Sequence, residues 1–123
     1  MLTDTQLRDA LRDCYDPDLP CNIVDLGLVL STSITSDPDA PGVGIPGVPP
    51  KSLVHIDLIL TLPSDAAEAQ LSAQIANRLA GLESVSQTTV TVLPTPTWTP
   101  ARISPAGRRH LGLDGNPSLV QIR

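Results

Sequence analysis

Between Leu53 and Leu93 the chain carries the patterns of a strand, a helix and a second strand in direct succession. Apolar residues at alternate positions from Leu53 to Leu62 predict a strand with one buried face. The helix that follows stops at Gly81, and its expected buried stripe consists of Leu71, Ile75, Leu79 and Leu82. A strand from Val85 to Leu93 comes next. Because a helix separates the two strands, they are expected to run parallel through a right-handed crossover.

A further strand is expected upstream, from Leu28 to Ile34. A proline- and glycine-rich loop over residues 36–50 joins it to the next strand, which predicts an antiparallel pair. The predicted fold is therefore α+β, a two-layer sandwich. Its small mixed three-stranded sheet, a β hairpin plus a right-handed β-α-β crossover, is covered by helices on one face. The length fits one domain over residues 1–123, with a frayed tail over residues 113–123.

Polar caps mark where the helices begin. Thr3, with Gln6 three residues later, forms a capping box before an N-terminal helix. The central helix begins at Ser64 or Asp65, either of which can act as its cap. Ser104 can cap a short last helix.

The charge balance excludes some classes of partner. The net charge of −5 argues against nucleic acid, whose recognition needs clustered Lys and Arg. The one concentration of basic residues, Arg102, Arg108 and Arg109 near His110, is interpreted as a solvated helix face. The acidic N-terminus lacks the basic start of a signal peptide, and no stretch is long enough to span a membrane. We therefore expect a cytoplasmic protein without a membrane partner.

The two cysteines, Cys14 and Cys21, have a spacing that fits neither a C-x-x-C motif nor a zinc knuckle. Two reduced thiols are expected in the cytoplasm, and the spacing leaves a local disulfide open. Cys14 also continues the apolar stripe of the first helix, which begins at Leu7, so a buried small side chain is expected there.

The segment DPDLPCNIVDLGLVL, Asp16 to Leu30, places prolines and aspartates directly before an apolar strand. A strand ending in LTLPSDA, a helix, a strand and then PTPTWTPARISPAGRRHLG follow in order. This succession resembles the small metal-sulfur cluster assembly domain family that includes SufT-type and PaaD-type proteins, and it covers nearly the whole chain. The resemblance implies an α+β domain that helps to mature iron-sulfur proteins, with partners among the iron-sulfur assembly machinery or its client proteins.

By the resemblance, the family's acidic proline loop falls on Asp16 to Pro20, and its Asn-Ile-Val-Asp-Leu-Gly turn on Asn22 to Gly27. Its strand-end threonine matches Thr61, and its aromatic motif begins at Trp98. Where such proteins read Pro-Gly-Cys-Pro, this chain reads PSDA, so Asp65 replaces the reactive cysteine. The resemblance implies an iron-sulfur cluster, but clusters are held mainly by thiolates, so no cofactor is expected here.

The candidate pocket consists of Asp16, Asp18, Leu19, Asn22, Asp25, Thr61 and Asp65. A carboxylate cluster of Asp16, Asp18 and Asp65 near Thr61 would suit a hard divalent ion or a cationic group on a partner. The simpler interpretation is that these aspartates bond local turn amides or cap a helix, and that Asn22 and Asp25 form a turn. The identity of any metal stays unknown.

Three other side chains have two interpretations each. His55 and Asp57 lie two positions apart on one strand face, where they form either a polar pair on a solvated outer face, which we favour, or half of a metal site. Trp98, among prolines, either covers the core or contacts a partner.

Two functions are compatible with these patterns. The first is a non-catalytic accessory or adaptor protein that resembles iron-sulfur assembly factors and acts through the Asp16 loop and Trp98. The alternative is a divalent-metal-binding protein, including a hydrolytic one, that uses the aspartate cluster. An exposed sheet edge would also allow a homodimer.

Overall fold

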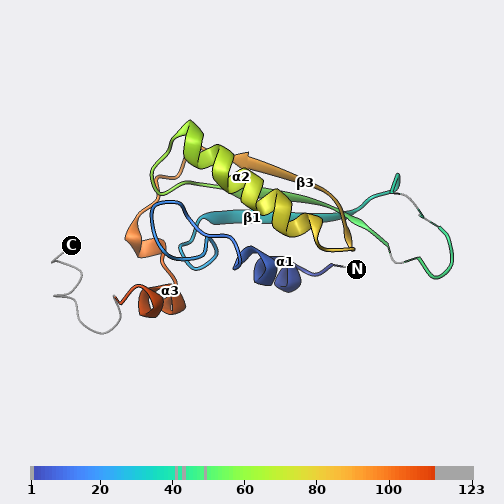
Figure 1. Ribbon diagram of the computed structural model, residues 1–123, viewed down its shortest axis with the longest axis horizontal. Coiled ribbons are helices and arrows are strands. Elements are labelled where there is room, and N and C mark those ends of the chain that lie inside the picture. Colours follow the sequence, from blue (N-terminus) through green and yellow to red (C-terminus); the bar gives the residue numbers. More distant parts are fainter. Residues whose placement is uncertain (1, 41, 43, 49, 113–123) are drawn as a thin grey trace.

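A mixed three-stranded sheet forms one layer of the molecule (Figure 1). The computed structural model describes residues 2–40, 42, 44–48 and 50–112. The strands are β1 (Val29–Ser36), β2 (Ser52–Leu58) and β3 (Val85–Val92), in the spatial order β1-β2-β3. β1 is antiparallel to β2, whereas β3 is parallel to β2 and lies directly beside it. The predicted α+β class and mixed sheet are confirmed.

Two helices cover one face of this sheet. α1 (Asp4–Leu11) packs against β1, α2 (Asp65–Ala80) packs against β3, and the two helices contact each other. The short α3 (Pro105–His110) lies at the end of the sheet where β2 and β3 end, and the connection between β1 and β2 extends beyond the opposite end (Figure 1). The bend after α1 and the start of α2 therefore lie at the same end as α3.

The caps that begin the helices agree with the sequence pattern. Thr3 and Gln6 form both hydrogen bonds of the predicted capping box at α1. At α2 the cap is Ser64, whose Oγ accepts a hydrogen bond from the Ala67 amide at 3.0 Å. Ser104 caps α3 as predicted. Asp65 is thus the first residue of α2 and does not cap it.

Alternation along β2 separates a buried face from an open one. The buried face consists of Ser52, Val54, Ile56 and Leu58. Beneath the helices Val54, Ile56 and Leu58 join the main hydrophobic core, which includes Leu71, Ile75 and Leu79 of α2. On the opposite face the register places Ser33, His55 and Thr89 in one row across the three strands.

The strand expected from Leu53 to Leu62 was predicted too long, because β2 ends at Leu58. Ile59 and Leu60 are both buried, and two successive side chains of a regular strand point to opposite faces. The chain leaves the sheet at this point and turns toward α2, which brings Thr61 and Leu62 to the end of the molecule that carries the candidate site.

The proline- and glycine-rich segment connects β1 to β2 through turns, and Gly42, Gly44 and Gly47 adopt positive φ angles within it. The tail expected over residues 113–123 lies outside the described residues. Among the helices that the structure describes, none is long and apolar enough to cross a membrane.

Candidate functional site

Asp16 is the most heavily bonded side chain of the predicted pocket. It is 6% exposed, and its Oδ2 accepts hydrogen bonds from the Asp18 and Leu19 amides at 2.8 Å each. The Thr61 hydroxyl lies 3.0 and 3.2 Å from its two carboxylate oxygens. Asp16 therefore both closes its own turn, as the simpler interpretation predicted, and joins the bend after α1 to the segment before α2.

Backbone hydrogen bonds close the bend into a narrow loop. Tyr15 and Asn22 form an antiparallel bridge, and the Asp16 amide donates to the Cys21 carbonyl at 3.2 Å. Gln74 of α2 exchanges two hydrogen bonds with the backbone of Tyr15, at 2.7 and 2.9 Å. The loop is thus fixed against the side of α2, and prolines 17 and 20 further restrict its backbone.

The three aspartates of the alternative metal hypothesis, Asp16, Asp18 and Asp65, do not form a cluster that could hold a metal ion. Asp18 and Asp65 are exposed, and Asp65 lines a shallow groove with Glu68 above an apolar floor of Leu60, Val92 and Leu93. Within the described part of the chain, no three His, Cys, Asp or Glu side chains lie close enough together to hold a metal ion. The segment before α2 reaches the Asp16 loop through Thr61, whereas Asp65 forms part of a separate groove.

Asn22 and Asp25 belong to a second corner, where the C-terminal segment packs on the turn before β1. Their side chains form hydrogen bonds within the turn, as predicted. Asn22 Oδ1 accepts a hydrogen bond from the Asp25 amide at 2.9 Å, and Asn22 Nδ2 donates one to Asp25 Oδ2 at 2.8 Å. Ser104 then donates to Asp25 twice, from its hydroxyl to the carboxylate at 3.0 Å and from its amide to the carbonyl at 2.7 Å. Asp25 is therefore an anchor for α3.

Trp98 belongs to the same corner and is half-buried against the core. Its indole N–H donates to the Leu26 carbonyl at 2.6 Å. Of the two interpretations, these contacts match core cover. The exposed aromatic side chain of the candidate site is Tyr15, which is 45% exposed and which sequence reasoning missed.

Two glycines permit this close packing. Gly27 has a φ of +77°, and a Cβ there would lie 2.5 Å from the Arg102 carbonyl oxygen. A Cβ on Gly107 would lie 2.9 Å from Ile103 Cγ2. In the sequence Gly27 stands out only as part of a family motif, although glycine is the residue that permits a positive φ and close approach of another chain segment.

Both cysteines are free and buried, so the local disulfide left open by their spacing does not form. Burial raises the pKa of the Cys14 thiol, and the nearby Asp13 carboxylate raises it further. Burial and the Asp25 carboxylate likewise raise the pKa of the Cys21 thiol. Neither side chain has the exposure or the thiolate character of a ligand or nucleophile.

His55 and Asp57 form the polar pair that was expected on the open sheet face. His55 Nε2 lies 2.8 Å from Asp57 Oδ1, and the Ser31 hydroxyl donates to Asp57 Oδ2 at 2.8 Å. The hydrogen bond from Ser31, followed by that from His55, lowers the pKa of Asp57. This network satisfies the two carboxylate oxygens without a metal ion.

A family model described as iron-sulfur cluster assembly protein matches residues 4–92. The chain belongs to this family. The match covers the sheet, α1 and α2, and therefore includes the Asp16 loop, Thr61 and Asp65. The C-terminal segment that carries Trp98 and α3 follows the matched residues.

Solved structures share the fold of this family member. A domain of unknown function from Bacillus anthracis has a TM-score of 0.66 at 23% identity, over 89% of this chain and 92% of that chain. A conserved hypothetical protein from Thermotoga maritima has a TM-score of 0.64 at 22% identity, over 90% of this chain and 95% of that chain.

A third structure is more distant in shape. It is a Mycobacterium tuberculosis protein described as associated with Fe-S complex assembly and repair, with a TM-score of 0.48 at 27% identity over 89% of this chain and 84% of that chain. A comparison with curated proteins gave no match.

The family name implies an iron-sulfur cluster. The side chains of this chain, however, do not provide the ligands that a permanently bound cluster needs. Such clusters are held mainly by thiolates. The two cysteines of the sequence, Cys14 and Cys21, are buried with raised pKa values, and an aspartate is the first residue of α2.

Proposed function

We propose that this family member is an accessory or adaptor protein in iron-sulfur cluster assembly that acts through protein contacts and not by holding a cluster. Two findings support the proposal: the family match, and the lack of any accessible thiol among the two cysteines. The observation that carries it is the exposed Asp65 at the first position of α2, where the resemblance places the reactive cysteine.

The partner surface that we propose surrounds the bonded pair Asp16 and Thr61. Tyr15 precedes Asp16 and is 45% exposed, and Leu62 follows Thr61 and is 63% exposed. These two large side chains flank a hydrogen-bonded pair whose backbone is fixed by the Tyr15 contacts with α2. An exposed aromatic side chain on a fixed segment is typical of protein interfaces, and Leu62 adds exposed apolar area on the segment bonded to it.

A strain deleted for the gene that encodes this chain provides the test. We expect wild type and Asp65→Ala to restore the specific activity of an iron-sulfur dehydratase equally. The double variant Tyr15→Ser with Leu62→Ser should restore less than about a fifth of it, because truncated interface anchors cost roughly 2 kcal/mol or more of binding.

The stability of the double variant serves as its control. Substitutions of exposed side chains change the free energy of unfolding by only about 0.5 kcal/mol, so its urea midpoint should stay near that of wild type. Full activity of the double variant would remove this surface from the proposal. Loss of activity in Asp65→Ala would show that chemistry at this position is required, and failure of wild type to restore activity would refute the function itself.

The setting for a reactive thiol survives at the start of α2. The variant Asp65→Cys should have a thiol pKa below the free value of about 8.5, because unpaired amides and the helix dipole stabilise a thiolate there. Alkylation rates measured between about pH 5 and pH 10 give this pKa. The native thiols provide a slow background, since burial raises their pKa.

A matched control is Ala73→Cys, at an exposed position in the middle of the same helix. Its thiol should titrate at or above the free value, because the amides there are already bonded within the helix. If the Asp65→Cys thiol titrated no lower than the Ala73→Cys thiol, the start of α2 would not have the proposed electrostatic character.

The alternative function, a divalent-metal site built from aspartates, is favoured by no contact among the described residues. A homodimer through a sheet edge stays a prediction.

A further inference from the structure

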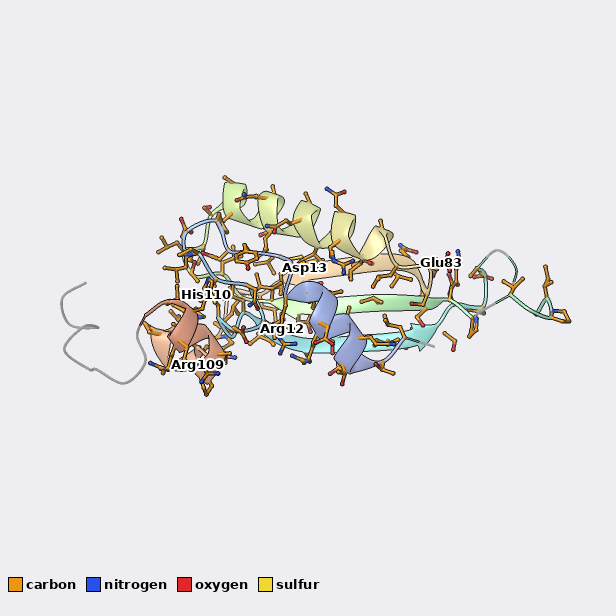
Figure 2. The ribbon with its side chains drawn as sticks, turned by 60° about the horizontal axis from the view of Figure 1, so that its bottom comes forward. Arg12, Asp13, Glu83, Arg109 and His110 are labelled. Atoms are coloured by element: carbon orange, nitrogen blue, oxygen red, sulfur yellow. The ribbon has the colours of Figure 1, made fainter. Side chains whose placement is uncertain are left out.

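Four arginines lie at the end of the molecule that carries α3, and we call this surface the basic end: Arg12, Arg102, Arg108 and Arg109. Arg12 follows α1, and the other three come from the segment between Trp98 and Leu111. Figure 2 shows Arg12 beside α3, with Arg109 and His110 on that helix. The chain has only eight Lys and Arg residues and a net charge of −5, so half of its basic residues occupy one end of an acidic molecule.

Contacts with the turn before β1 place Arg12 and Arg102, and a contact within the C-terminal segment places Arg108. Arg12 Nε lies 4.0 Å from Asp25 Oδ1, and the same oxygen accepts the Ser104 hydroxyl hydrogen bond at 3.0 Å, at the start of α3. Arg102 Nε donates to the Gly27 carbonyl at 3.0 Å, and Arg108 donates to the Pro100 carbonyl at 3.0 Å. Three of the four guanidinium groups are therefore held in place before any partner arrives, which lowers the entropic cost of binding.

Most of this positive charge is not neutralised within the described residues. Arg102, Arg108 and Arg109 form no ion pair there, and Arg109 is exposed and makes no side-chain hydrogen bond. Arg12 pairs with Asp9 at 2.8 Å. The two carbonyl contacts use one nitrogen each of Arg102 and Arg108, so their other guanidinium nitrogens have no hydrogen-bond partner among the described residues.

We propose that the basic end binds an acidic segment of a partner protein, rich in Asp and Glu. Guanidinium groups bind carboxylates through paired, charge-assisted hydrogen bonds, so a few carboxylates match this surface. Nucleic acid fits less well, because its phosphates continue at one charge per roughly 1.7 Å of duplex and would extend over the acidic remainder of the molecule. The solvated helix face expected from the sequence is thus also a recognition surface, and this proposal does not depend on the function proposed above.

Fluorescence anisotropy with a labelled Asp-Glu repeat peptide tests this proposal on the full chain. At about 50 mM NaCl the peptide should bind wild type, and raising the salt to about 500 mM should abolish binding because screening weakens exposed charge pairs. The variant Arg109→Glu should raise the Kd by about fivefold to tenfold, since an attraction becomes a repulsion. Arg109→Gln should show a smaller rise in the same direction.

The matched control is Lys51→Glu, which changes the net charge equally but lies directly before β2, at the far end of the sheet. Its effect on the Kd should stay below about twofold at about 150 mM NaCl, because that distance exceeds the screening length. Equal effects of Lys51→Glu and Arg109→Glu, or no binding by wild type at low salt, would overturn the proposal. Tighter binding of a single-stranded RNA of matched length than of the peptide would instead assign the basic end to nucleic acid and overturn it as well.

Discussion

The variant Gly27→Ala is expected to release the C-terminal segment from the turn before β1. At a φ of +77° an alanine costs about 1–2 kcal/mol relative to glycine. Its Cβ would lie 2.5 Å from the Arg102 carbonyl oxygen and 2.7 Å from Arg102 Cβ, and such overpacking adds about 1–3 kcal/mol. The total of roughly 2–5 kcal/mol is a large part of the 5–15 kcal/mol that stabilises a domain of this size.

Urea unfolding followed by circular dichroism measures this loss, and the fluorescence of Trp98, the only tryptophan, reports on the segment itself. Gly44→Ala is the matched control, because Gly44 has a φ of +81° but a Cβ added there would meet nothing within 4 Å. It should cost only the backbone strain, about 1–2 kcal/mol. Equal losses for the two variants would mean that the approach of Arg102 to Gly27 does not hold the segment in place.

The variant Asp16→Ala should lower the free energy of unfolding by about 2–4 kcal/mol, since it leaves several donors without their charged acceptor. The donors are the Asp18 and Leu19 amides and the Thr61 hydroxyl. The bend after α1 and the segment before α2 should then move independently, which faster hydrogen exchange at the Asp18 and Leu19 amides would show.

Two controls separate the parts of this effect. Asp18→Ala changes an exposed side chain in the same loop and should alter stability by less than about 0.5 kcal/mol. Thr61→Val removes only the bond across to the segment before α2 and should cost about 1 kcal/mol. If Asp16→Ala destabilised the protein no more than Asp18→Ala, the Asp16 carboxylate would not be the link between the two segments.

Local patterns predicted the elements of this fold well. The caps at Thr3 and Ser104 and the alternation along β2 depend on residues close in sequence, and each was confirmed. The end of β2 was missed because the local sequence does not show whether the buried residue Leu60 lies inside the strand or after its end. Its burial follows from packing against elements that come later in the chain.

The site was only partly predictable for the same reason. The turn bonds of Asp16 and Asn22 span two or three residues and follow from the side-chain chemistry. The bonds that connect Thr61 to Asp16 and Ser104 to Asp25 span 45 and 79 residues, and they exist only once the sheet has placed both partners. The resemblance identified Thr61, whereas no signal identified Ser104 as a partner of Asp25.

The face of the sheet that α1 and α2 do not cover limits which surfaces of this protein can bind another protein. Its central row of serine, histidine and threonine carries hydroxyl and imidazole groups. Water can form hydrogen bonds with these groups, whereas a flat apolar surface could not. Stacking a second copy on it would strip that water and leave donors unmatched, at a cost of about 1–3 kcal/mol for each group. Assembly is thereby directed away from the broad plane of the strands.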